Sequence, residues 1–348
     1  MPEVTTTGFD RNRLRDQAAR LAAQGVFIGT SSWKYQGWRG LLYDEQRYVY
    51  RGKFAETRFE RTCLAEYAEV FKTVCVDAAY YTFPKLAHLE GLAAQVAADF
   101  QFGFKVTDEI TVKKFPNLPR FGHRAAQPNV NFLNADLFAS AFLHPCEAIR
   151  PHVGLLMFEF SRFYSADFAH GRDFVAVLDT FLSQLPKGWP YAVEMRNHHW
   201  LEPDYFACLA RHGVTHVFNS WEAMPPVSEQ MVLAGSRTNP NLTAARFLLK
   251  PGRKYEEAVK TFAPYDRVQE VNDEARAAGA NLIREGQASP DRKTFIFVNN
   301  RLEGNALETI SAMLGDGSDL PSSTVEGQSD EAVRSANLTL ESLGGFCH

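Results

Sequence analysis

The stretch that decides the fold runs from VGLLMFEFS at residues 153–161, through DFVAVLDTFLSQL at 173–185, to YAVEMRN at 191–197. The first and last segments are apolar at nearly every position until a polar residue ends them. Strands that are covered on both faces have this composition. The middle segment repeats apolar residues at helical spacing. A strand, a helix and a second strand in this order predict a parallel βαβ unit.

The same alternation continues in both directions from this unit. Eight short apolar or β-branched runs, separated by helix-like segments, begin near Val26, Thr73, Phe100, Val153, Tyr191, Thr215, Thr243 and Thr294. Eight such repeats predict an α/β fold, a single (β/α)8 TIM barrel over residues 25–314. A doubly wound open sheet is the structural alternative. It is disfavoured because no G-x-G-x-x-G motif follows the first predicted strand.

Two extensions flank the predicted barrel. Residues 1–24 contain a predicted amphipathic helix, with Asp10 as N-cap, apolar Leu14, Ala18 and Leu21 on one face, and Gly25 as a stop. Residues 315–348 are rich in Ser, Gly, Asp and Glu. This composition predicts a flexible tail that is mobile or loosely docked.

Composition excludes several classes of protein. The chain has 348 residues, a net charge of −4 and a pI of about 6.2, so its overall field favours neither nucleic acid nor membrane. Its five cysteines are scattered and form no C-x-x-C pair, which predicts no disulfide framework and a cytoplasmic location. No apolar run reaches the roughly 20 residues that a membrane span needs.

The barrel prediction locates the functional site, because TIM barrels carry their active sites at the carboxyl ends of the strands. Polar residues end the predicted strands here. Glu194 and Glu159 are the candidate catalytic residues, as acid/base groups. The candidate ligand-binding residues are Lys105, Arg196, Arg246, Trp33, Asp77, Tyr81, Asn219, Asn299 and Asn300.

Glu194 and Arg196 form the predicted centre of this site. They lie two apart on one strand, so with Ala192 they share a face, and we expect that face to point into the barrel mouth. Arg246 and Lys105 are the nearest cations expected across the opening. Positive neighbours would keep Glu194 ionised and able to act as a base. A purely structural ion pair is the alternative interpretation.

Charge is distributed unevenly around the predicted mouth. Segments 34–62, 105–125 and 246–254 carry net charges of +3, +3 and +4, whereas segments 159–171, 194–204 and 219–230 carry −1, −2 and −2. In a closed barrel the basic segments would occupy one arc and bind an anion. The simpler interpretation is solvated surface charge. Aromatic residues lie among the basic ones, which suits either stacking on bases and sugars or a lid that packs on itself.

Two further features bear on the mouth. The segment 108–136 is long, contains three prolines and lacks a sustained helical period, which predicts a mobile cover. His198 and His199 are possible metal ligands, but in an extended segment their side chains would point different ways. We therefore expect no metal and no cofactor.

Several motifs together resemble the YecE-like family, TIM-barrel proteins grouped as a domain of unknown function. The matching motifs are IGTSSWKYQGWRGLLY at 28–43, the Tyr80-Tyr81-x-Phe83-Pro84 run, and Glu194-x-Arg196-x-x-x-Trp200. The resemblance spans about Phe27 to Leu314. It implies a TIM barrel and brings no established reaction.

The chain departs from this family pattern near the mouth. The second strand has Cys75 and Asp77 where the family usually has Glu and Asn, and the sixth has Asn219 where Asp is common. Leu248 and Leu249 replace a usual His-Gly pair. These changes make a substrate borrowed from other members unsafe.

Three functional hypotheses remain open. The first is an enzyme, a hydrolase or lyase, that acts on a small phosphorylated or otherwise anionic ligand. The second is a nucleic-acid-binding or phosphodiester-processing protein. The third is a non-catalytic barrel that binds a ligand or a partner. The sequence predicts no oligomeric state.

Overall fold

Eight parallel strands close into a barrel in the computed structural model, which describes residues 9–315. Their hydrogen-bonded order is β1-β10-β9-β8-β7-β6-β5-β4, and β1 pairs with both β10 and β4. The strands are β1 Val26–Thr30, β4 Thr73–Val76, β5 Gln101–Lys105, β6 Val153–Phe160, β7 Tyr191–Met195, β8 Thr215–Ser220, β9 Leu242–Phe247 and β10 Lys293–Val298. Each begins within one residue of its predicted start, and the (β/α)8 TIM barrel is confirmed.

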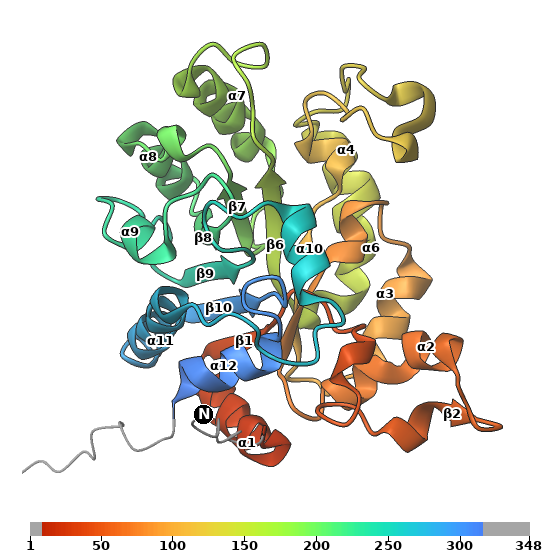
Figure 1. The fold of residues 1–348 in the computed structure, drawn as a ribbon. Helices are drawn as coiled ribbons and strands as arrows, with labels where there is room; N and C mark the ends of the chain where they lie inside the picture. The colour runs from red at the N-terminus through yellow and green to blue at the C-terminus, as the bar shows by residue number, and fades with distance from the viewer. Residues whose placement is uncertain (1–8, 316–348) are drawn as a thin grey trace, which may run out of the picture. The chain divides into compact units, whose positions relative to one another are not determined.

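Helices surround the strands (Figure 1). They are α1 Arg11–Ala23, α2 Glu56–Tyr67, α3 Leu86–Ala93, α4 Asp108–Thr111, α5 Ala135–Leu137, α6 His144–Cys146, α7 Gly171–Gln184, α8 Pro203–Arg211, α9 Val227–Met231, α10 Tyr255–Phe262, α11 Asp273–Gln287 and α12 Ala306–Leu314. Over residues 9–315, none of these helices has both the length and the apolar character needed to cross a membrane. The predicted tail lies outside the described residues, apart from Gly315.

Helix α1 forms as its sequence predicts. The Asp10 side chain accepts a hydrogen bond from the Arg13 amide at 2.9 Å, which satisfies one free N–H of the first turn. Leu14, Ala18 and Leu21 are buried. Gly25 has a φ of 82°, a conformation that glycine adopts without strain, and it turns the chain into β1.

The barrel interior is apolar toward the amino ends of the strands. The rings of Phe295 and Phe297 stack with centroids 6.3 Å apart, and two glycines give them room. A Cβ atom on Gly103 would lie 2.6 Å from Cζ of Phe297, and one on Gly154 would lie 2.6 Å from Cζ of Phe295. These rings fill the middle of the interior, and the charged side chains of the interior rows lie at its carboxyl end.

Two connections contain short elements that the sequence did not predict. The loop after β1 contains a hairpin of β2 Val49–Tyr50 and β3 Lys53–Phe54. Its turn residues Arg51 and Gly52 have φ of 50° and 73°, as a two-residue hairpin turn requires. The segment 108–136 has no long helix, as expected, but contains α4, a 3-10 turn at Pro119–Arg124 and part of α5. Its mobility stays a prediction.

Candidate functional site

The site is built by alternation along the strands. Side chains two apart on a strand point the same way, so each interior row of apolar residues continues into the mouth. On β7, Ala192 is followed by Glu194; on β6, Met157 is followed by Glu159. Glu159 and Glu194 are register partners on adjacent strands. The resulting mouth cluster comprises Asp77, Lys105, Glu159, Glu194, Arg196 and Arg246.

Salt bridges connect the members of the mouth cluster. Both Nε and Nη2 of Arg196 lie 2.9 Å from Oε1 of Glu194, and Nη1 of Arg246 lies 2.7 Å from Oε2. Oε2 of Glu159 contacts Nζ of Lys105 at 2.6 Å, Nη2 of Arg196 at 2.8 Å and Nη1 of Arg246 at 3.2 Å. Glu194 therefore contacts Arg196 and Arg246, whereas Lys105, the third cation expected near it, contacts Glu159.

The mouth cluster is electrically balanced. Its three cations, Lys105, Arg196 and Arg246, face three carboxylates. The third carboxylate is Asp77, whose Oδ1 lies 3.2 Å from Nη2 of Arg246. Burial opposes ionisation of Glu159, but Arg196, Lys105 and Arg246 outweigh it and lower the pKa of Glu159 to about 2. Burial also opposes the charge on Arg246, yet Glu194 and the other nearby groups raise its pKa well above the usual value.

Exposure divides the mouth cluster into two layers. The side chains of Glu194, Glu159 and Arg246 are 0%, 2% and 3% exposed. Those of Lys105 and Arg196 are 12% and 10% exposed, and that of Asp77 is 35% exposed. A ligand in the mouth can therefore contact Asp77, Lys105 and Arg196 directly. The buried side chains of Glu194, Glu159 and Arg246 lie beneath these three and fix their positions through salt bridges.

Aromatic rings cover the accessible cations. Nζ of Lys105 lies 3.6 Å from the ring centroid of Tyr80, and the Arg196 guanidinium lies 3.8 Å from that of Trp221. Such cation–π contacts stabilise a desolvated positive charge. Sequence reasoning missed Trp221. Its one sequence signal is its position, immediately after the last residue of β8.

Two cavities lie near the mouth cluster. No cluster residue lines the first, which is linked to the cluster through the Tyr80 ring that contacts Lys105, whereas Arg196 lines the second. The first, of about 540 Å³, is lined by Tyr80, the pair Lys113 and Lys114, Arg162 and further residues that include Phe115 and Tyr164. The second, of about 330 Å³, is lined by Arg196, Arg162 and the loop around His198. Arg162, Phe163 and Tyr164, which follow β6, line both. Three cations therefore surround the first cavity, against one lining carboxylate, Asp167.

The remaining predicted site residues have different surroundings. The Asn219 amide donates to the Met195 carbonyl at 3.0 Å, and Oδ1 of Asn299 accepts from the Arg301 amide at 3.0 Å. Oδ1 of Asn300 accepts from the Ala306 amide at 2.8 Å. These three side chains hold the backbone of strand ends and loops.

The two aromatic candidates lie apart from one another. Trp33 is buried and lines a separate cavity with Lys34, Glu60 and His88. Tyr81 is 61% exposed, and the Arg120 guanidinium lies 4.9 Å from its ring centroid. Of the two, Tyr81 is the one available to a ligand from solvent.

The donor set at the mouth is poorly suited to a metal ion. The carboxylates of the mouth cluster are matched one for one by cations, so they do not fit a further positive ion. His198 and His199 were expected to diverge if their segment were extended, but the segment is not extended. They belong to a short 3-10 helix, His198–Trp200, and their ring centroids lie 3.6 Å apart.

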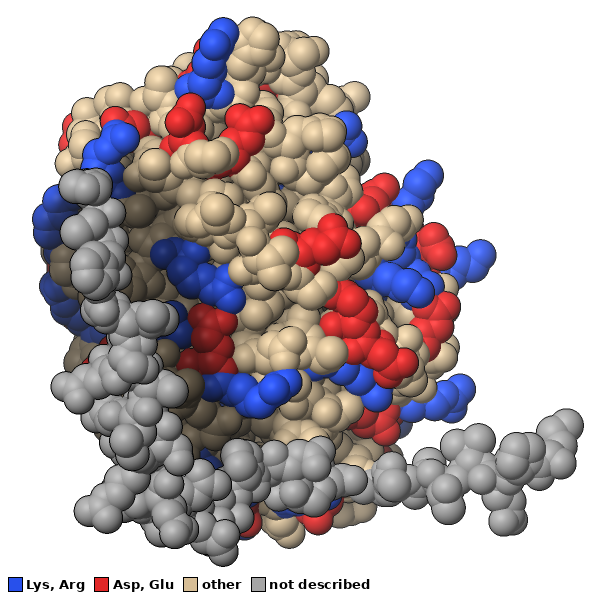
Figure 2. Space-filling model, turned by 90° about the vertical axis from the view of Figure 1, so that its left-hand side faces the viewer, with Lys and Arg blue, Asp and Glu red and all other residues tan. Residues whose placement is uncertain are grey.

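One outer face of the molecule shows mixed charge. Figure 2 views the side that carries α8, α9 and α11, where basic and acidic side chains are interspersed. A protein that binds nucleic acid through such a face would present a patch of mostly positive sign. This visible face therefore does not supply one.

Comparisons with known proteins identify the fold and a family of unknown function. The family model described as "Protein of unknown function DUF72" matches residues 27–324. A crystal structure of a DUF72 family protein from Enterococcus faecalis has a TM-score of 0.55 and 18% identity, covering 83% of this chain and 94% of that one. One from Thermotoga maritima has a TM-score of 0.52 and 18% identity, covering 83% and 96%. No curated protein matches.

Proposed function

The chain belongs to the DUF72 family, whose name records an unknown function, and from the barrel mouth we propose that it is an enzyme acting on a small phosphorylated or otherwise anionic ligand. The observation that carries this proposal is the pair Lys105 and Arg196. Both cations reach solvent at the mouth, and both are fixed by the same oxygen of Glu159 at 2.6 and 2.8 Å.

Preorganisation is what makes these cations suited to an anion. Side chains already held in place need little reorganisation when a ligand binds, so less of the binding free energy is lost. Arg196 presents a planar guanidinium, which can pair with a phosphate or carboxylate through two hydrogen bonds.

The nearby cavity supplies the excess positive charge that the mouth cluster lacks. Lys113, Lys114 and Arg162 line it against one acid, Asp167. Its aromatic walls, which include Tyr80 and Tyr164, suit a ligand with a planar or apolar part. The proposed ligand therefore combines an anionic group at Lys105 and Arg196 with a body in this cavity.

The chemistry is best assigned to Asp77. Glu159 and Glu194, the candidates from sequence, are enclosed by cations, and a carboxylate with a pKa near 2, as in Glu159, is a weak base. Asp77 is the carboxylate of the mouth cluster that a ligand can reach. We assign proton transfer to Asp77 and positioning of the cations to the two glutamates.

A ligand panel tests the proposal. Thermal shift followed by calorimetry would compare inorganic phosphate, sugar phosphates, nucleotides and dicarboxylates. Lys105→Met and Arg196→Met should each weaken binding about 10- to 100-fold, the loss expected for one charged hydrogen bond. Lys187→Met, an exposed lysine between α7 and β7, is the matched control and should bind normally. Unchanged affinity in both mouth variants would refute the site.

Turnover separates the enzyme from a non-catalytic binder. Asp77→Asn should keep ligand affinity within a few fold, because the cations remain, and should abolish turnover. If the wild-type protein binds a ligand tightly yet converts none of it, the non-catalytic hypothesis replaces the enzyme.

Nucleic acid is the second candidate. Tyr81 and Tyr164 are 61% and 63% exposed, with the guanidinium groups of Arg120 and Arg162 at 4.9 and 5.5 Å from their ring centroids. Exposed rings beside cations can stack on unpaired bases. A fluorescent single-stranded oligonucleotide would test this directly, and Tyr81→Ala with Tyr164→Ala should then weaken its binding.

A further inference from the structure

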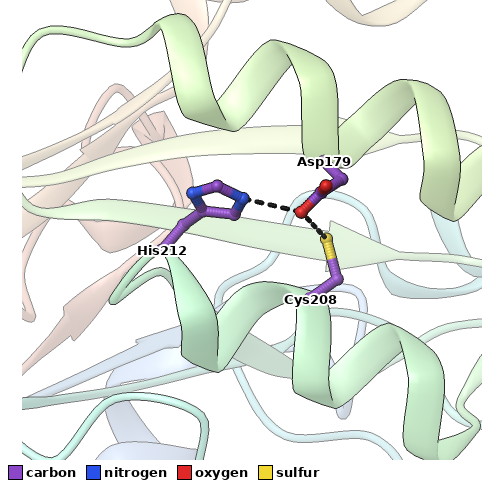
Figure 3. Close-up of side chains that lie close together, drawn as sticks. All are labelled: Asp179, Cys208 and His212. Atoms are coloured by element: carbon purple, nitrogen blue, oxygen red, sulfur yellow. Dashed lines mark hydrogen bonds and ion pairs between the residues drawn. The ribbon is translucent and has the colours of Figure 1, made fainter.

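A group of three possible metal ligands lies away from the barrel mouth, between α7 and α8 (Figure 3). Asp179 lies on α7, Cys208 lies on α8, and His212 is the C-cap residue of α8. Oδ1 of Asp179 lies 2.8 Å from Nε2 of His212 and 3.7 Å from Sγ of Cys208. The side chains of Cys208 and His212 therefore converge on this one Asp179 oxygen.

The ligand types and their spacing match a zinc site. Residues four apart on a helix share a face, which places Cys208 and His212 side by side toward α7. Thiolate, imidazole and carboxylate are the three protein ligands that zinc takes. Among the described residues 9–315, this is the group in which such ligand atoms all lie within 4.8 Å of one another.

We propose that Asp179, Cys208 and His212 bind a zinc-type divalent cation that joins α7 to α8. Zinc bonds of about 2.0–2.3 Å in a tetrahedron place ligand atoms roughly 3.3–3.8 Å apart. The present separations of 2.8 and 3.7 Å therefore need side-chain shifts of about an ångström or less. Water completes the fourth position on the exposed side of Asp179.

Binding exchanges one proton for the cation. In the metal-free site, Cys208 donates its S–H to Oδ1 of Asp179. When the cation arrives, a metal–sulfur bond forms, the S–H bond breaks and its proton passes to solvent. His212 also gives up the Nε2 proton that faces Asp179 and takes one on Nδ1, so that Nε2 can bind the cation. The dication, thiolate and carboxylate then sum to zero charge, with His212 neutral.

Arg211 is the competitor for this site. Its Nη1 lies 2.7 Å from the same Asp179 oxygen, and its side chain is 62% exposed. A cation at the site would repel it, and it can move into solvent at little cost. The helices α7 and α8 follow β6 and β7, which carry Glu159 and Glu194, so the cation would brace the part of the barrel beneath the mouth cluster.

Cobalt titration of the untagged, full-length protein tests the proposal. Co²⁺ reports thiolate ligation by absorption, and Zn²⁺ should displace it. We expect one Co²⁺ per chain, loss of the thiolate band in Cys208→Ser, and at least about 10-fold weaker binding in His212→Ala. Arg211→Ala should tighten binding about 2- to 5-fold, the effect of one exposed charge. Cys146→Ser, another buried cysteine, and His199→Ala should bind as wild type.

Several outcomes would overturn the site. These are no Co²⁺ uptake by the wild type, a thiolate band that persists in Cys208→Ser, and equal loss in Cys146→Ser. Weaker rather than tighter Co²⁺ binding in Arg211→Ala would also overturn the site, because Arg211 would then not compete with a cation for Asp179. Circular dichroism checks that each variant folds. If Cys208→Ser does not fold, Co²⁺ binding by Asp179→Asn and Arg211→Ala decides between a metal site and a salt bridge that binds no metal. Since the readout is metal, failure here leaves the proposed mouth function untouched.

Discussion

Glu159 contacts three cations of the mouth cluster through one carboxylate oxygen. Its buried carboxylate faces Lys105, Arg196 and Arg246 at once, at 2.6, 2.8 and 3.2 Å. Buried ion pairs add little net stability compared with apolar packing, but removal of one partner leaves uncompensated charge. The effect of a substitution at Glu159 is therefore set by the cations that remain.

The first prediction concerns this uncompensated charge. Glu159→Gln should lower the free energy of unfolding by about 3–5 kcal/mol, because three cations would then face two carboxylates. Urea unfolding measures it. The matched control is Glu90→Gln, at an exposed position of α3, which should change stability by less than about 0.5 kcal/mol. Similar small losses in both variants would mean that water already enters the mouth cluster and screens it.

The second prediction concerns pH. The pKa of Glu159 is lowered from an ordinary 4.5 to about 2 in the folded protein, so its contribution is fully present above pH 4.5. That contribution, on the order of 3 kcal/mol, is lost as pH falls from about 5 toward 2. Unfolding free energies across this range should fall more steeply in wild type than in Glu159→Gln. Parallel curves would contradict the lowered pKa.

At the scale of elements, the strands were predictable and the short connections were not. A buried strand such as β6 is one long apolar run, and its chemistry shows in sequence. The hairpin β2–β3 has two residues in each strand, too few for any periodicity. The segment 108–136 is likewise shaped by particular contacts, such as the 3.0 Å salt bridge of Arg120 with Asp108, which spacing alone does not reveal.

The third prediction tests how the strands pack inside the barrel. Gly103→Ala on β5 should destabilise the protein by about 1–3 kcal/mol, since the new Cβ would lie 2.6 Å from the Phe297 ring, which is packed on Phe295. Gly91→Ala in α3 is the control: nothing lies within 4 Å of its Cβ, and alanine should stabilise the helix by up to about 1 kcal/mol. Equal effects in urea unfolding would contradict this packing.

The fourth prediction concerns the cover at 108–136. Its Arg120 and Arg124 are held by Asp108 and Glu109 at 3.0 and 2.5 Å, and Lys113 and Lys114 line the proposed ligand cavity. Trypsin should cut first within this segment, and a bound ligand should slow that cut. Mass spectrometry of early fragments identifies the site. First cleavage elsewhere among residues 9–315 would show that the segment is not a mobile cover.

At the scale of the whole molecule, closure of the barrel explains why the mouth cluster could be found from sequence. Eight strand ends meet at one opening, so any polar residue that continues an interior row must lie near the others, as Glu194, Arg196 and Arg246 do. The charge balance and the covering ring of Trp221 could not be predicted. They depend on which side chains meet across the opening, and sequence order does not specify that.

The fifth prediction also belongs to the whole molecule, because it depends on how many charges a ligand engages. A small anion held by Lys105 and Arg196 in a largely buried site is weakly screened, so its affinity should fall only a few fold between 50 and 200 mM salt. A nucleic acid that contacts six or more phosphates would lose about 10³-fold over the same range. The net charge of −4 and the mixed charges of the face in Figure 2 favour the weak salt dependence of a small anion.

Calorimetry with the best anion from the panel, and anisotropy with a single-stranded oligonucleotide, should be run at the same salt concentrations. A steep salt dependence of oligonucleotide binding that disappears in Arg196→Met would show that the mouth binds a nucleic acid and not a small anion.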